Sequence, residues 1–197
     1  MDVLTTERLC LRTLTLDDTG RLLEALGDPL TMAHYLAPKD RHDVERWITW
    51  ATESYEANGF GLWAVERIED GAFLGDCGPM LQPVDGKVLP EIGYHLVRRE
   101  WGCGYATEAA AAALAWVFHE TAFERVCSIV SPSNVPSRRV AARIHRSLEL
   151  FTWERTDTEM CLYTTTRGQL AEPALAERAG GAGTGGGARP PDASPPG

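Results

Sequence analysis

The stretch best suited to chemistry runs from Arg98 to Tyr105, where two glycines stand between an expected strand and an expected helix. It reads Arg98 Arg99 Glu100 Trp101 Gly102 Cys103 Gly104 Tyr105 and leads into alanine-rich sequence starting at Ala106. A glycine-rich turn from a strand into a helix lets backbone N–H groups surround phosphate oxygens, and the helix dipole adds about half a positive charge there. We therefore predict a pyrophosphate cradle formed by Gly102, Cys103, Gly104, Tyr105 and Ala106.

Two other phosphate-binding motifs fit this stretch less well. The spacing Gly102-x-Gly104-x-x-Thr107 lacks the third glycine of the dinucleotide fingerprint, and the strand before it belongs to a run of hairpins instead of a βαβ unit. The stretch also lacks the Gly-Lys-Ser/Thr ending of a P-loop. Two glycines at such a turn are more often structural than ligand-binding, so the prediction depends on the rest of the chain.

The elements that must position this turn alternate along the sequence between extended and helical patterns. Periodicity and turn residues predict strands at 9–14, 61–68, 73–81, 88–97, 126–131, 148–155 and 159–165, and helices at 17–26, 43–57, 106–120 and 134–146. Asp70-Gly71 and Asp85-Gly86 are expected to be hairpin turns. A strand, a helix and a strand within an otherwise antiparallel run imply a parallel pair with a crossover helix. The fold class is therefore mixed α/β.

Length and composition indicate one ordinary globular domain. The chain has 197 residues, of which 44% are hydrophobic and 24% are charged. We assign residues 1–170 to this domain and expect residues 171–197, which are rich in Gly, Ala and Pro, to form a disordered tail, because such a segment buries too little apolar area to offset its ordering entropy.

The charge and the longest apolar run exclude several classes of partner. The net charge of -9 argues against general nucleic-acid binding. The run from Ala109 to Phe118 is too short for a membrane span of about 20 residues, and the first residues lack the pattern of a secretory signal. We expect a cytoplasmic protein that binds neither nucleic acid nor membrane.

The cysteines encode neither a disulfide framework nor a metal site. There are five, an odd number, and they are dispersed without a Cys-x-x-Cys motif. We expect each to be a small buried hydrophobic residue in a reducing compartment, and we expect no metal.

Several motifs of the chain resemble the GNAT N-acetyltransferase superfamily. Arg99-x-x-Gly102-x-Gly104 at the start of a helix resembles its acyl-coenzyme A signature. Further stretches resemble the RimJ/RimL-like branch of this superfamily. They occur in the family's order and extend from about Leu4 to Gly168: TERLCLR at 6–12, GFGLWAV at 59–65, LGDCG at 74–78, EIGY at 91–94, WGCGYATEA at 101–109, and Asn134-x-x-Ser137-x-x-Val140. The resemblance implies a mostly antiparallel central sheet with a splayed parallel strand pair and flanking helices.

This resemblance implies that acetyl-CoA is the cosubstrate and that its acetyl group passes to an amine by direct attack. The strand before the glycine turn ends at Leu96 and Val97, so these residues are expected to offer backbone groups to pantetheine and an N–H to the thioester oxygen. Arg98, Arg99 and Arg138, with Arg139, suit the phosphates, although the arginines after Asn134 also fit a solvated helix face.

The amine must lose a proton before attack, and two side chains on one face of the expected strand are candidates for the base. Glu91 is the first and His95 the second, since an imidazole ordinarily titrates near neutral pH. Each also fits a structural role. Ser137 is the candidate for protonating the leaving thiolate, with Asn134 orienting the pantetheine, although helix capping alone would explain both Ser137 and Asn134.

Four questions stay open in the sequence: the acceptor, whether the protein is catalytic, its oligomeric state and the conformation of one helix end. The acceptor is a protein N-terminal amine or a small-molecule amine, attracted by an acidic first half that holds 17 acids and 8 bases in residues 1–97. A noncatalytic acyl-CoA-binding regulatory module is the alternative function, and a homodimer is compatible with an exposed sheet edge. His145 stands where the family usually has a helix-ending glycine, so we expect a strained or shifted helix end there.

Overall fold

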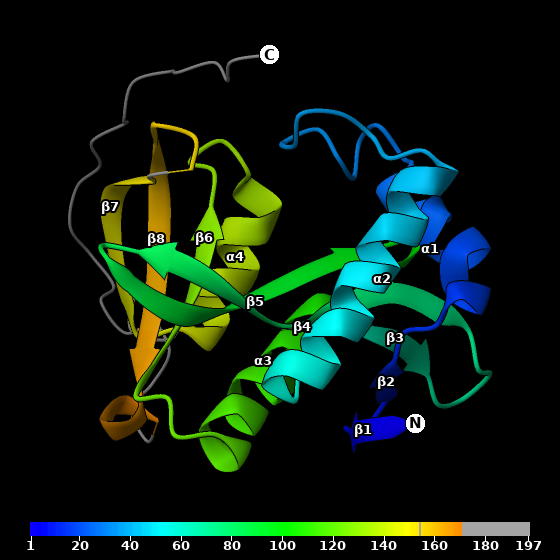
Figure 1. The fold of residues 1–197 in the computed structure, drawn as a ribbon, viewed down its shortest axis with the longest axis horizontal. Coiled ribbons are helices and arrows are strands. Elements are labelled where there is room, and N and C mark those ends of the chain that lie inside the picture. Colours follow the sequence, from blue (N-terminus) through cyan, green and yellow to red (C-terminus); the bar gives the residue numbers. More distant parts are fainter. Residues whose placement is uncertain (154, 171–197) are drawn as a thin grey trace, which may run out of the picture.

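The computed structural model describes residues 1–153 and 155–170, so the predicted tail at 171–197 lies outside the described residues. A single sheet of eight strands has the order β1-β2-β3-β4-β5-β6-β8-β7 (Figure 1). Its strands are β1 (Asp2–Thr5), β2 (Leu9–Thr13), β3 (Trp63–Arg67), β4 (Phe73–Val84), β5 (Lys87–Leu96), β6 (Arg125–Val130), β7 (Ser147–Trp153) and β8 (Thr158–Thr166). The helices are α1 (Thr19–Leu26), α2 (Arg41–Asn58), α3 (Tyr105–Glu120) and α4 (Val135–Ile144), with 3₁₀ turns at Leu16–Asp18, Arg98–Glu100 and Arg167–Gln169.

The predicted mixed α/β class is confirmed. Every neighbouring pair of strands is antiparallel except β5 and β6, which are parallel and joined by the crossover helix α3. The short strand β1 was not predicted, because its four residues carry no clear alternation. The hairpin turn at Asp85-Gly86 is confirmed: both residues have positive φ, 50° and 70°, as a type I′ turn requires.

Two apolar layers fix the helices to opposite faces of the sheet. The larger core joins α3 to β2, β3, β4 and β5 through side chains such as Leu11, Val65 and Val117. The second core joins α1 and α2 to the other face through side chains such as Leu22, Ile48 and Met80. Figure 1 shows α2 crossing β4, while β6, β8 and β7 form the end of the sheet on the left of the view. The strand β5 therefore presents one side-chain face to α2 and the other to α3 and α4.

The expectation of strain at the end of α4 is wrong. The helix ends at Ile144, and His145 is extended, with φ −103° and ψ 165°, so no left-handed residue is needed. The chain passes directly into β7, with the Arg146 N–H donating to the carbonyl of Thr164. The His145 ring is fully buried, and its two nitrogens lie 3.2 Å from Thr165 Oγ1 and 3.1 Å from Ser128 Oγ.

We predict that this buried ring makes stability depend on pH. Burial, together with nearby Arg146, lowers the pKa of His145 to about 3. Below about pH 6.5 the unfolded chain binds a proton at this imidazole, whereas the folded chain does not. The free energy of unfolding is therefore highest above that pH and decreases as the pH falls. Between pH 7.5 and pH 5, the wild type should lose about 2 kcal/mol more unfolding free energy than His145→Gln.

Urea unfolding at both pH values measures this difference. His119→Gln, which removes an exposed imidazole on α3, is the matched control and should keep the wild-type pH dependence. Equal pH dependence in the wild type and in His145→Gln would show that His145 does not contribute as described.

Candidate active site

The parallel strands β5 and β6 are paired at a single residue pair within the described chain. Glu91 faces Cys127, and no further backbone pair joins the two strands in the described chain. Beyond that point side chains bridge the strands: Ser128 Oγ donates to the carbonyl of Ile92 at 2.9 Å, and the Ile129 N–H donates to Glu91 Oε1 at 3.1 Å. The strands therefore separate toward their C-terminal ends, as the resemblance implied.

The glycine turn lies directly after the diverging end of β5. Gly102 and Gly104 have φ values of 80° and 84°, which L-residues with a side chain rarely adopt. Within residues 1–153 and 155–170, no protein acceptor lies within hydrogen-bond distance of the N–H groups of residues 102 to 107. They stand at the N-terminal end of α3, where the helix dipole favours an anion. The turn thus has the chemistry of the predicted phosphate cradle.

Two arginine side chains hold the glycine turn in place. Arg8 donates to the carbonyl of Cys103 at 3.0 Å and to Glu108, while Arg67 donates to Glu100 at 3.0 Å. Both guanidinium groups also lie over the ring of Tyr105, at 4.5 and 5.9 Å. Neither arginine was predicted as a site residue, although Arg8 belongs to the motif at 6–12. These contacts use a carbonyl and carboxylate groups as acceptors, so they leave the N–H groups of the turn free.

At the end of β5, the N–H groups of Leu96 and Val97 point in different directions. The Val97 N–H donates to the carbonyl of Leu74 at 2.8 Å, so it is not available to a thioester, contrary to the expectation. Successive N–H groups of a strand point to opposite sides, so that of Leu96 points toward the gap beside β6. The carbonyl of Leu96 accepts from Trp101 Nε1 at 2.9 Å.

The arginines assigned to phosphates are differently placed. Arg98 and Arg99 form exposed ion pairs with Asp28 and Glu24 of the α1 side. Such surface pairs contribute about 0–1 kcal/mol, so a phosphate can replace the carboxylates at little cost. Arg138 donates to the neutral oxygens of Tyr163 and Pro132 and has no carboxylate partner in the part of the chain that the structure describes.

Asn134 caps α4, with its Oδ1 accepting from the Ser137 N–H at 3.1 Å, which matches the capping alternative. The Ser137 hydroxyl lies 2.9 Å from the hydroxyl of Tyr94 on β5. Burial raises the pKa of Tyr94, although its hydrogen bond with Ser137 opposes the rise. Tyr94 lies in the EIGY motif, but no sequence pattern pairs it with Ser137. The two hydroxyl groups bring α4 to β5 beside the gap.

The opposite face of β5 carries both candidate bases. Glu91 accepts from the Ile129 N–H, and burial raises the pKa of its carboxyl group, partly offset by that N–H. His95 is 5% exposed; its Nδ1 lies 2.8 Å from Asp76 Oδ1 and its Nε2 lies 2.7 Å from the Tyr35 hydroxyl. Trp47 Nε1 donates to the other oxygen of Asp76 at 2.8 Å. Asp76, Tyr35 and Trp47 were not predicted as site residues, because their motifs lie far apart in the sequence.

The cysteines depart from expectation at two positions. Cys77, Cys127 and Cys161 are buried as predicted, but Cys10 is partly exposed and Cys103 is exposed in the glycine turn. All five are free. Cys103 lies outside the core because its turn is the surface of the expected cradle.

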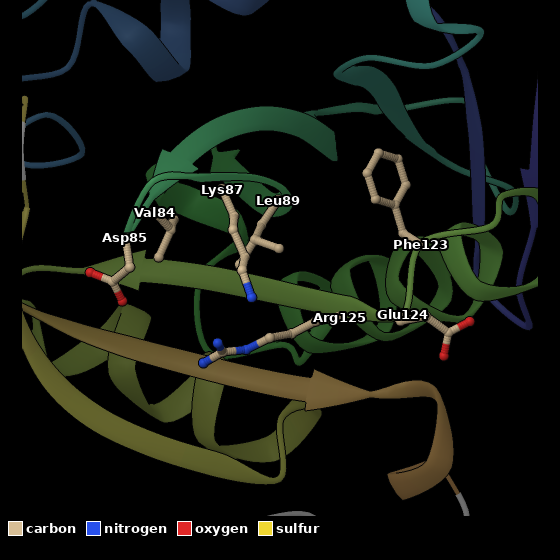
Figure 2. Close-up of a pocket in the computed structure, with 7 residues that line it drawn as sticks. All are labelled: Val84, Asp85, Lys87, Leu89, Phe123, Glu124 and Arg125. Carbon is tan, nitrogen blue, oxygen red and sulfur yellow. The ribbon is translucent and has the colours of Figure 1, made fainter.

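A cavity lies at the other end of the parallel pair. Its volume is 430 Å³. It is lined by residues of the β4–β5 turn, the start of β5 and the segment that leads into β6: Val84, Asp85, Lys87, Leu89, Phe123, Glu124 and Arg125 (Figure 2). Lys87 and Leu89 begin β5, whereas the glycine turn follows its end, so this cavity is not the phosphate cradle. Over the described residues, no cluster of His, Cys, Asp and Glu could hold a metal ion, and no helix is long and apolar enough to cross a membrane.

Comparison with known proteins agrees with this geometry. Residues 8–146 match the family model described as an acetyltransferase (GNAT) domain. The uncharacterized protein YkkB of Bacillus subtilis (strain 168) is 36% identical over 155 residues, which cover 77% of this chain and 90% of that protein.

Two solved structures share the fold. An acetyltransferase from Agrobacterium tumefaciens str. C58 superposes with a TM-score of 0.72 at 28% identity, covering 85% of this chain and 95% of that one. RimJ of Mycobacterium smegmatis, in complex with CoA-disulfide, has a TM-score of 0.64 at 25% identity, with 89% of each chain covered. The resemblance to the RimJ/RimL-like branch is thereby supported. With its splayed parallel pair and glycine turn, the chain belongs to the GNAT acetyltransferase family.

Proposed function

We propose that this protein transfers an acetyl group from acetyl-CoA to an amine. The observation that carries the proposal is the row of N–H groups without acceptors at residues 102 to 107, beside a strand that diverges from its parallel neighbour. A row of N–H groups at a helix start suits a diphosphate, and the gap suits an extended arm next to it. The similar RimJ structure contains a CoA-disulfide, which supports CoA as the ligand here.

In this proposal each predicted cofactor residue has a defined task. The N–H groups of Gly102, Cys103, Gly104, Tyr105 and Ala106 bind the diphosphate. Arg98, Arg99 and Arg138 contribute positive charge around it. The Leu96 N–H donates to the thioester oxygen, where negative charge develops during attack. Asn134 acts by capping α4 and thereby fixing the position of Ser137.

The reaction requires two proton transfers from the acceptor nitrogen. A base takes the first proton from the ammonium group, leaving a neutral amine. The amine nitrogen attacks the thioester carbonyl carbon, a C–N bond forms, and the C–S bond breaks with its electron pair on sulfur. The second proton leaves nitrogen as the amide forms. The Ser137 hydroxyl delivers its proton to the thiolate, and the second proton replaces it through solvent. The products are the acetylated amine, CoA as a free thiol, and one proton released to solvent.

The acceptor class follows from the face of β5 that meets α2. Two carboxylates, Asp76 and Glu91, and the aromatic rings of Tyr35 and Trp47 lie around His95. Carboxylates and aromatic faces attract a cation, so a primary ammonium group fits this side. Protein N-termini and small amines both meet this description. The homodimer and the cytoplasmic location stay predictions.

A panel of amines tests the function directly. Purified protein with acetyl-CoA should release free thiol in the presence of at least one amine, either an N-terminal peptide or a small polyamine or amino sugar. The rate without an amine is the control. CoA binding without thiol release for any amine would favour the alternative, a noncatalytic acyl-CoA-binding module.

The cradle gives a second prediction. Gly102→Val and Gly104→Val should each abolish CoA binding, because a β-branched residue resists positive φ and its side chain blocks backbone approach to the diphosphate. Wild-type protein at a hundredfold excess of CoA over Kd should gain about 2.7 kcal/mol of unfolding free energy, and these variants should gain none.

Gly71→Val is the matched control. Gly71 has φ 70° and open space around its missing side chain, as Gly102 does, but it lies in the loop between β3 and β4. Calorimetry should find lower stability with unchanged CoA affinity. If Gly102→Val and Gly104→Val bind CoA as tightly as Gly71→Val does, the turn is not the cradle.

The pair of hydroxyl groups gives a third prediction. Ser137→Ala should lower kcat about 10²-fold with little change in CoA affinity, because the leaving thiolate loses its proton donor. The pH dependence of the loss should be weak. Ser131→Ala removes a neighbouring hydroxyl that contacts Ser133 and is the control. If Ser137→Ala keeps the wild-type kcat, Ser137 does not protonate the thiolate and has only a structural role in α4.

A further inference from the structure

The hydrogen bonds around His95 connect a buried carboxylate to an exposed side chain. Asp76 is fully buried on β4, and its two carboxylate oxygens accept from His95 Nδ1 and from Trp47 Nε1. Tyr35, in the loop between α1 and α2, reaches Nε2 of the same ring with its hydroxyl group. These contacts join β4, β5, α2 and the loop in one network.

The carboxylate determines the tautomer of the imidazole. An ionised carboxylate only accepts hydrogen bonds, so the proton of the neutral ring lies on Nδ1. Nε2 is then the acceptor, and the Tyr35 hydroxyl must donate to it at 2.7 Å. The tyrosine oxygen keeps its lone pairs for a further donor.

Tyr35 is the member of this network that lies toward the surface. His95 is 5% exposed and its Nε2 is already covered by Tyr35, whereas half of the Tyr35 surface is exposed. Burial of the hydroxyl end raises the pKa of Tyr35, and the carboxylates of Glu91 and Asp76 add to the rise. The phenol therefore keeps its proton at neutral pH and can pass it to the ring.

Resting on the proposed function, we propose that Tyr35, His95 and Asp76 form a proton relay that deprotonates the acceptor amine. The Tyr35 oxygen takes a proton from the ammonium group as its own proton moves to Nε2 of His95. The resulting imidazolium is balanced by the carboxylate of Asp76. After the acetylated amine leaves, the proton returns by the same route to solvent. Tyr35 touches the substrate, and Asp76 is a positioning residue.

Glu91 has a different task in this arrangement. Its carboxylate accepts the Ile129 N–H that the diverging strands leave without a backbone partner. It therefore stabilises the gap between β5 and β6. The charged and titratable groups that face His95 are Asp76 from β4, Tyr35 from the loop and Glu91 from β5. Lys39 lies over the Trp47 ring at 4.8 Å.

The test compares Tyr35→Phe, His95→Gln, Asp76→Asn and Glu91→Gln. Values of kcat/KM for thiol release are measured from about pH 6 to pH 9, with CoA affinity and melting temperature for each variant. Tyr35→Phe and His95→Gln should each lower kcat/KM about 10²-fold at neutral pH without changing CoA affinity. The loss should shrink at high pH, where more acceptor arrives deprotonated. Asp76→Asn should also lower kcat/KM and move the acid limb of the profile to lower pH.

The double variant Tyr35→Phe with His95→Gln separates a relay from two independent contributions. Residues that act as one unit are not additive, so the double variant should be no slower than the slower single variant. Tyr55→Phe is the matched control, because its hydroxyl contacts only backbone groups of Leu14 and Leu62. It should lower the melting temperature and keep the wild-type pH profile.

Three results would overturn the relay. Wild-type kcat/KM in Tyr35→Phe would exclude the tyrosine, and multiplicative losses in the double variant would exclude a shared proton path. A loss found only in Glu91→Gln would move the base to that residue. Wild-type protein that releases no thiol with any amine would overturn the proposed function together with the relay, a result distinct from the other three.

Discussion

The separation of β5 from β6 is the constraint on which the site depends. A parallel ladder normally pairs every backbone N–H and carbonyl, and an unpaired buried group costs about 1–3 kcal/mol. Here the ladder ends at Glu91 and Cys127, and two of the groups left over, the Ile92 carbonyl and the Ile129 N–H, are satisfied by the side chains of Ser128 and Glu91. Buried His145 in turn contacts Ser128. The gap is thus a maintained feature of the sheet, held open by polar side chains from both strands.

The glycine turn depends on the same divergence, because it begins where β5 leaves the sheet. Arg8 donates to its Cys103 carbonyl, Trp101 ties it to the Leu96 carbonyl at the end of β5, and its glycines adopt positive φ. These contacts fix the turn before any ligand arrives, so little ordering entropy is lost on binding. Preorganised N–H groups are also more effective than flexible ones at stabilising charge.

The face of β5 toward α2 shows how a buried polar network is kept. Isolated, the carboxylate of Asp76 would be costly to bury, but His95 and Trp47 supply donors to both oxygens. Three elements, β4, β5 and α2, must pack correctly for this to happen, which ties the network to the fold. The opposite face of the same strand brings Tyr94 to Ser137 on α4. One strand, β5, therefore positions groups on both faces of the sheet next to the gap.

Local sequence determined the elements, the mixed α/β class and the glycine turn, because periodicity, turn residues and the Gly102-x-Gly104 spacing act over a few neighbouring residues. It also placed Glu91 and His95 on one face of a strand. Asp76, Tyr35 and Arg8 could not be assigned in this way, since their partners are 19, 60 and 95 residues away. The commitment of the Val97 N–H to β4, and the extended conformation of His145, likewise depend on strand pairing. Those choices are made by tertiary packing, because hydrogen-bond partners distant in sequence are fixed only when the sheet assembles.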